Sequence, residues 1–190
     1  MHDKKTAITM SAIEVFQRKG IEHAKVSDIV KGAGIAQGTF YLYFQSKLSV
    51  MPSIAEVMVE KMIKGLKSGI NINDCFDQQL KDFIEMIFDL TKQYRDIFAL
   101  IYAGLASSEY LVNWEDIYDK YYNEFAKIID EAQNNNSINP LINSKRYAVL
   151  LIGLIESAAE QSYLYDKQSE QYIKIKKQEV FNFAMKGLSK

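Results

Sequence analysis

Hydrophobic side chains recur every three or four residues along most of the chain, which is the spacing of a helix with one buried face. The first such segment covers residues 6–18. Within it, Ile8, Ala12 and Phe16 follow one another at intervals of four, and Gly20 stands where a helix commonly ends. We therefore expect a first helix over residues 6–18.

The same spacing predicts eight further helices with short connections between them. They cover residues 28–33, 37–44, 46–67, 74–91, 94–107, 113–133, 143–165 and 168–188. Ser27 and Ser46 are placed to cap the second and fourth helices, and Pro52 falls inside the fourth, where it should kink the helix. The pattern thus predicts an all-α fold of about nine helices.

Composition agrees with a helical fold and also indicates where in the cell the protein works. Only two prolines and nine glycines occur in 190 residues, which is few for the tight turns that connect strands. The longest apolar run, residues 147–155, is far shorter than the roughly 20 residues of a membrane span. Cys75 is the single cysteine and is expected to be a small core residue. We expect a cytoplasmic protein that does not enter membranes.

Charge is distributed unevenly along the chain. Residues 1–50 hold seven Lys or Arg and four acidic residues, whereas the other 140 residues hold 16 basic and 20 acidic residues. A basic N-terminal part favours a polyanionic partner such as nucleic acid. A solvated basic surface would give the same count, so the charge alone is weak support.

The three short N-terminal helices form the most informative feature of the sequence. Each is too brief to be stable alone, and a glycine turn joins the second to the third, as in a helix-turn-helix that places its second helix in a DNA groove. On that helix, Gln37 and Thr39 offer groups that reach base edges, and Gly38 permits close approach of the backbone. The hydroxyls of Tyr41 and Tyr43 suit phosphate oxygens.

Residues 26–47, VSDIVKGAGIAQGTFYLYFQSK, resemble the signature of the TetR/AcrR family of transcriptional regulators, as do residues 12–20, AIEVFQRKG. The resemblance covers about residues 6–48. Its core, Gly-Thr-Phe-Tyr-x-Tyr-Phe followed by Lys, is rarely met elsewhere. The rest of the chain resembles the family only in length and helical pattern.

This resemblance implies an all-helical protein of about nine helices with two domains. Residues 1–48 would bind DNA, and residues 49–190 would bind a ligand and form a homodimer through the helices at about 143–165 and 168–188. Most members of the family are repressors that leave a double-stranded operator, commonly palindromic, when a small molecule enters the C-terminal domain.

Carried over position by position, the resemblance makes Gln37 and Thr39 base-reading residues. It makes Ser27, Tyr41, Tyr43 and Lys47 phosphate-contacting residues. Many relatives have serine at the position of Ala36, which has no hydroxyl with which to cap the helix or touch phosphate. The expected DNA-binding residues are Ser27, Ala36, Gln37, Gly38, Thr39, Tyr41, Tyr43 and Lys47.

Aromatic residues are abundant in the predicted ligand domain. Aromatic stripes at helical spacing usually form a core, but a pocket inside a helical bundle is lined by the same side chains with a few polar groups. Glu156 lies at the edge of an apolar face, so it either meets a cationic or hydrogen-bonding ligand or pairs with a nearby Lys or Tyr. The expected effector-binding residues are Phe88, Phe98, Tyr102, Tyr110, Trp114, Tyr118 and Glu156, and they favour a lipophilic or aromatic effector.

Two other functions remain as alternatives. An enzyme in a helical bundle needs paired carboxylates or histidines at a cleft, but His2 and His23, the only histidines, both lie in the N-terminal part. No catalytic residue, metal site or cofactor is expected. A helical adaptor without a DNA role would show no salt-dependent binding to duplexes. We therefore predict a sequence-specific DNA-binding transcriptional regulator, a repressor released by its effector.

Overall fold

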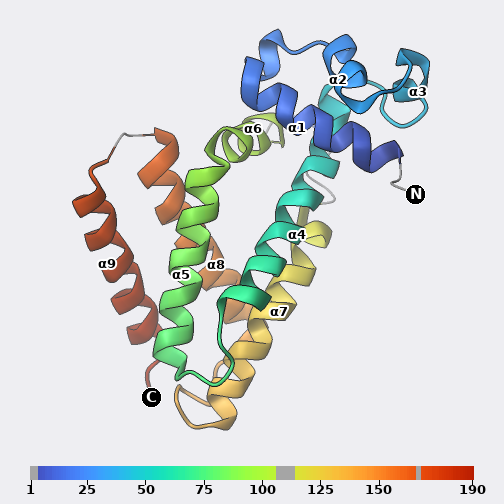
Figure 1. Cartoon of the computed structure of the whole chain (residues 1–190). Coiled ribbons are helices and arrows are strands. Elements are labelled where there is room, and N and C mark those ends of the chain that lie inside the picture. The colour runs from blue at the N-terminus through green and yellow to red at the C-terminus, as the bar shows by residue number, and fades with distance from the viewer. Residues whose placement is uncertain (1–3, 106–113, 166–167) are drawn as a thin grey trace. The chain divides into compact units, whose positions relative to one another are not determined.

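The computed structural model describes residues 4–105, 114–165 and 168–190, and within these ranges it has nine α-helices and no strand (Figure 1). The predicted all-α fold is confirmed. The helices are α1 (Lys4–His23), α2 (Val26–Ala33), α3 (Gln37–Tyr41), α4 (Met51–Gly69), α5 (Phe76–Gln93), α6 (Arg95–Leu105), α7 (Trp114–Asn134), α8 (Ser144–Glu160) and α9 (Glu170–Leu188). A 3-10 turn, η1 (Leu48–Val50), precedes α4, and a π-helical turn, η3 (Gln161–Tyr165), follows α8. None of the described helices is both long and apolar enough to cross a membrane.

The chain divides into two compact units. The head unit comprises the described residues of Met1–Met58 and Asp96–Ile117, and the body unit comprises those of Val59–Arg95 and Tyr118–Lys190. Helices α4 and α7 therefore contribute residues to both units, and nearly all of α6 belongs to the head unit. The domain boundary expected after residue 48 stays a prediction.

In the head unit, α1 packs closely against α2. Ile8, Ala12 and Phe16 of α1 are buried, as their spacing predicts. The Ser11 hydroxyl donates a hydrogen bond of 2.7 Å to the carbonyl of Ile29 on α2. A Cβ added to Gly32 would lie 2.2 Å from the Ser11 Oγ atom, so this approach requires glycine. Gly20, with a φ of 73°, interrupts α1 where the sequence predicts its end.

Helix starts in the head unit differ in part from the expected ones. Helix α2 begins at Val26 after the cap residue Lys25, so the predicted capping role of Ser27 is wrong. The Asp28 carboxylate, three residues into the helix, accepts the backbone N–H of the cap residue Lys25 at 3.1 Å, which is the acidic half of a capping box.

The start of the fourth helix also needs one correction. Ser46 caps its first turn as expected, because the Ser46 hydroxyl accepts the backbone N–H of Ser49 at 3.2 Å, although this turn is η1. Pro52 is the second residue of α4, close to a helix start where proline is tolerated. It therefore marks the start of the helix rather than the break inside it that the sequence led us to expect.

In the body unit, α5, α8 and α9 pack side by side (Figure 1). Helix α7 joins α5 through the stacked rings of Phe83 and Phe125, whose centroids lie 3.9 Å apart. Lys92 on α5 and Glu170 on α9 form an ion pair of 2.8 Å between their Nζ and Oε1 atoms. Apolar packing inside thus holds the bundle, and the exposed ion pair adds little to its stability.

Cys75 is exposed, so its predicted place in the core is wrong. It is the extended cap residue that precedes α5, whereas the next residue, Phe76, is buried. A cap position lies outside the apolar stripe of its helix, which explains why a small apolar side chain stays in solvent there.

Candidate DNA-binding and effector sites

A tight glycine turn joins α2 to α3. Gly34 has a φ of 66°, a left-handed conformation that favours glycine. The backbone N–H of Ile35 donates to the carbonyl of Val30 at 3.1 Å and so closes the end of α2. Phe40, fully buried, fixes α3 against the rest of the head unit. The local geometry is that of a helix-turn-helix.

Most predicted DNA-binding residues lie on the outside of this helix-turn-helix. Thr39 is half-buried, whereas six of them are exposed: Ser27, Ala36, Gln37, Gly38, Tyr41 and Tyr43. Since the buried Phe40 holds the opposite side of α3, the amide of Gln37 and the two tyrosine hydroxyls are accessible to a large partner. Their contacts with bases and phosphates stay predictions.

Gly38 has no packing partner inside the protein. A Cβ added there would meet no atom within 4 Å. Glycine within a helix costs about 1 kcal/mol relative to alanine, so folding alone gives no reason for glycine at this position. A surface that approaches the α3 backbone from outside would supply the reason.

Lys47 has a different environment from the one expected. Its ammonium group donates to three backbone carbonyls at the end of α1, those of Ile21 (2.6 Å), Glu22 (3.1 Å) and Ala24 (2.9 Å). All three N–H donors of the ammonium group are thereby used inside the protein. Lys47 thereby ties the segment before η1 to carbonyls at the end of α1, and its predicted phosphate contact stays a prediction. Sequence reasoning missed this role because nothing in the sequence tells where those carbonyls lie.

The structure describes only part of the predicted effector site. Phe88 and Tyr118 in the body unit, and Phe98 in the head unit, are buried. Tyr110 and the side chains of Tyr102 and Trp114 lie outside the described residues. Sequence reasoning therefore identifies interior positions, but burial is also what a plain core would give.

Glu156, on α8, carries the most unusual polar group of the body unit. Its Oε1 atom is buried and has no hydrogen-bond partner among the described residues, while the residue as a whole is half-buried. Burial, and to a smaller extent the charge of Glu160, raise the pKa of this carboxyl to about 8 against a hydrogen bond with Tyr118 that lowers it. Glu156 is thus a neutral carboxylic acid near pH 7.

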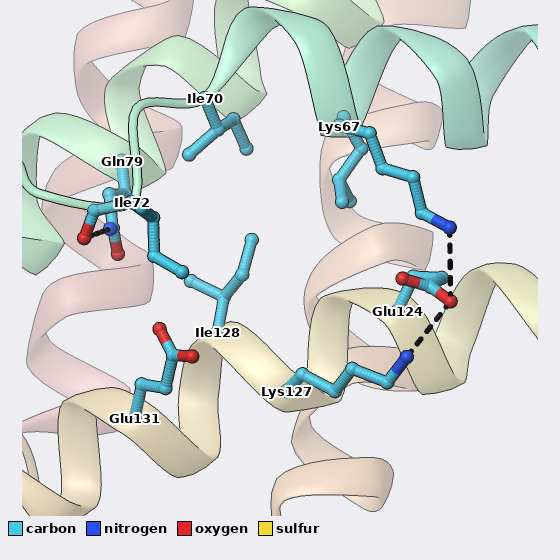
Figure 2. Close-up of a pocket in the computed structure, with 9 residues that line it drawn as sticks. Lys67, Ile70, Ile72, Gln79, Glu124, Lys127, Ile128 and Glu131 are labelled. Carbon is cyan, nitrogen blue, oxygen red and sulfur yellow. Dashed lines mark hydrogen bonds and ion pairs between the residues drawn. The ribbon is translucent and has the colours of Figure 1, made fainter.

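A pocket of about 240 Å³ lies elsewhere in the body unit (Figure 2). Figure 2 shows Ile70, Ile72 and Ile128 pointing into the same space, while Lys67 and Lys127 both pair with Glu124, at 3.3 Å and 2.9 Å. Its full lining is Leu66, Lys67, Ile70, Ile72, Gln79, Glu124, Lys127, Ile128 and Glu131. None of these is a predicted effector-binding residue.

Comparison with known families places both parts of the chain. Residues 8–52 match the model of bacterial regulatory proteins, tetR family, and residues 80–188 match that of the tetracyclin repressor-like C-terminal domain. The HTH-type transcriptional regulator YvdT of Bacillus subtilis is 40% identical over 181 residues, which cover 95% of this chain and 93% of that protein.

Two solved structures share the fold. The fatty acid degradation regulator FadR of Bacillus halodurans aligns with a TM-score of 0.78 and 20% identity over 99% of this chain and 97% of its own. FadR of Bacillus subtilis, in complex with stearoyl-CoA, aligns with a TM-score of 0.76 and 21% identity over 96% and 98%. The predicted resemblance is confirmed, and the chain belongs to the TetR family of helix-turn-helix transcriptional regulators.

Proposed function

We propose that the chain is a repressor that binds operator DNA as a homodimer and leaves it when a small lipophilic effector enters its C-terminal domain. The exposed polar face of α3, held in place by the buried Phe40, carries this proposal. Gln37 and Thr39 would read bases, and Ser27, Tyr41 and Tyr43 would hold phosphates. The proposed role is binding rather than catalysis. We place the protein in the cytoplasm, because that is where bacterial DNA lies.

Exposed apolar side chains on α8 and α9 support the homodimer. Leu150 is 65% exposed on α8, and Ile175 and Phe183 are 51% and 69% exposed on α9. Gly153 and Ser157, also exposed on α8, are small enough to let a partner helix approach closely. A second copy would remove these side chains from water, and its twofold symmetry would match a palindromic operator.

The chemistry around Glu156 supports the class of effector. A neutral carboxylic acid donates a hydrogen bond to an acceptor such as a carbonyl, and the aromatic and aliphatic interior suits an apolar chain. The B. subtilis structure holds stearoyl-CoA, which combines an apolar chain with a thioester carbonyl. Long-chain acyl-CoA is therefore the first effector to test, and a lipophilic cation that pairs with ionised Glu156 is the second.

Fluorescence anisotropy of labelled operator DNA tests this proposal. The operator is first selected from random duplexes with the full-length protein, and stearoyl-CoA, free CoA or a lipophilic quaternary amine is then added. We expect stearoyl-CoA to release the DNA and free CoA to leave it bound. Glu156→Gln should keep the response to stearoyl-CoA, because an amide still donates a hydrogen bond.

Each failure in this experiment has a distinct meaning. A protein that selects no duplex contradicts the DNA-binding role itself. A protein that binds its operator equally with and without stearoyl-CoA contradicts the acyl-CoA effector. Release by the quaternary amine alone, lost in Glu156→Gln, establishes the cationic effector in its place.

A further inference from the structure

Leu42 is a large apolar side chain in an unexpected position. It directly follows α3 and is 82% exposed. Its neighbours Tyr41 and Tyr43 are 51% and 42% exposed, so three large side chains in succession face solvent. Single exposed leucines are common, but such a run on a small domain has a cost in solubility that folding does not require.

The backbone places Leu42 on the outward side of α3, at its C-terminal end. Its φ of −72° and ψ of −22° continue the helix, so Leu42 lies one turn after Gly38. Both lie on the side of the helix away from the buried Phe40. Because Gly38 has no side chain, the flank of Leu42 that faces it stays open to an incoming group.

We propose that Leu42 contacts the 5-methyl group of a thymine in each operator half-site. This inference rests on the proposed DNA-binding function. Thymine is the base that presents a methyl group in the major groove, and apolar side chains recognise it. The amide of Gln37 suits hydrogen-bonding groups on base edges, whereas the exposed isobutyl group of Leu42 offers apolar contact alone, which is what a methyl group needs.

The surroundings of Leu42 favour DNA over an apolar protein partner. Its neighbours in the chain, Tyr41 and Tyr43, are exposed and end in phenol hydroxyls. Such polar groups beside Leu42 suit base edges and phosphates, whereas the core of a protein–protein interface is a larger apolar cluster.

Replacement of thymine by deoxyuridine tests the contact, because this exchange removes only the methyl group. Each dT of one half-site of the selected operator is replaced in turn by dU, and affinities are measured for the wild type and for Leu42→Ala. We expect one replacement to weaken wild-type binding about three- to tenfold. Leu42→Ala, which lacks the contact in both half-sites, should bind the dT operator more weakly than the wild type binds this dU operator, and it should be insensitive to dU at that position. Leu141→Ala, which shortens a leucine that is 91% exposed in the body unit, should behave as the wild type.

The outcomes separate this inference from the proposed function. If the protein selects an operator but dU affects wild type and Leu42→Ala equally at every position, Leu42 does not read a methyl group. If no dT is sensitive in the wild type, the contact does not exist. If the wild type selects no duplex at all, the DNA-binding function fails and this inference fails with it.

Discussion

The head and body units use polar groups in opposite ways. Helix α3 exposes the amide of Gln37 and buries Phe40, so its functional and structural sides are separate. The body unit buries the carboxyl oxygen of Glu156 beside Tyr118 within the packing that holds α7 and α8. A candidate site on the surface can therefore be recognised in the sequence by its polar residues. A site in the interior cannot, because it uses the same residue types as the core.

We expect the largest effect from loss of the dimer, because the proposed homodimer is what brings two copies of α3 to one operator. Phe183→Asp places a charge on the exposed apolar face of α9, which should prevent dimerisation without disturbing the fold of the monomer. Because each half-site then binds alone, operator affinity should fall about a thousandfold. Light scattering and anisotropy measure the two quantities.

Leu141→Asp is the matched control, since it adds the same charge at a leucine that is 91% exposed outside α8 and α9. It should leave both the dimer and the operator affinity intact. A Phe183→Asp protein that stays dimeric would place the interface elsewhere.

The second effect is a pH dependence of stability that arises from the buried carboxyl of Glu156. Because the pKa of Glu156 is about 8 in the folded chain against an ordinary 4.5, the folded state keeps a proton that the unfolded state loses. Its contribution to stability is therefore full below pH 4.5, declines as the pH rises to about 8, and is constant above that.

Urea unfolding at pH 5 and pH 9 measures this decline. The free energy of unfolding of the wild type should fall relative to Glu156→Gln by up to about 4 kcal/mol between the two values. Groups that do not interact with Glu156 cancel in the difference, which therefore reports Glu156 together with its coupling to Glu160 and Tyr118. Parallel curves would show that Glu156 is not buried as an acid.

The third effect concerns Lys47, whose ammonium group donates to three backbone carbonyls of the head unit. Lys47→Met keeps the length of the side chain but loses three hydrogen bonds, so the head unit should be destabilised by about 1 to 2 kcal/mol. The slope of log affinity against log salt should stay unchanged.

Lys31→Met removes the same charge from an exposed position on α2 and controls for net charge. If Lys47→Met instead reduced the salt slope by about one per subunit at unchanged stability, Lys47 would be a phosphate contact after all.

The smallest effect concerns Gly38. Gly38→Ala adds a methyl group that meets no protein atom, and it should stabilise the head unit by about 0.5 to 1 kcal/mol. Operator affinity should nevertheless fall, because the added methyl group occupies the space that DNA needs. Gly69→Ala, at the end of α4 and equally unobstructed, should leave operator affinity unchanged. Equal operator affinity in the Gly38→Ala protein would mean that DNA does not approach α3 at this point.

The sequence predicts the helices well because apolar spacing is a local property. The expected segments 74–91 and 168–188 lie within two residues of α5 and α9. It fails at the helix start near Ser27, because α2 already begins at Val26 and Ser27 lies inside its first turn. It also fails at Cys75, where one residue separates a solvent-exposed cap from a buried face.

For the candidate sites too, the sequence predicts only what a local pattern can show. Polar residues on α3 stand out because they interrupt an apolar pattern. Leu42 does not, since a leucine in a helical segment fits a core equally well, and only its 82% exposure distinguishes it. The carbonyls that bind Lys47 come from residues more than 20 positions earlier in the chain, so no local pattern indicates them.

Base reading by the exposed face of α3 is the central claim, and sequence discrimination tests it most directly. Affinities of the wild type and Gln37→Ala are measured at one salt concentration for the selected operator and for a scrambled duplex of equal length. We predict that the wild type prefers its operator about a thousandfold or more, and that Gln37→Ala loses at least about tenfold of that preference while binding the scrambled duplex as before. Equal wild-type affinity for both duplexes, or an equal loss on both in Gln37→Ala, would contradict the account.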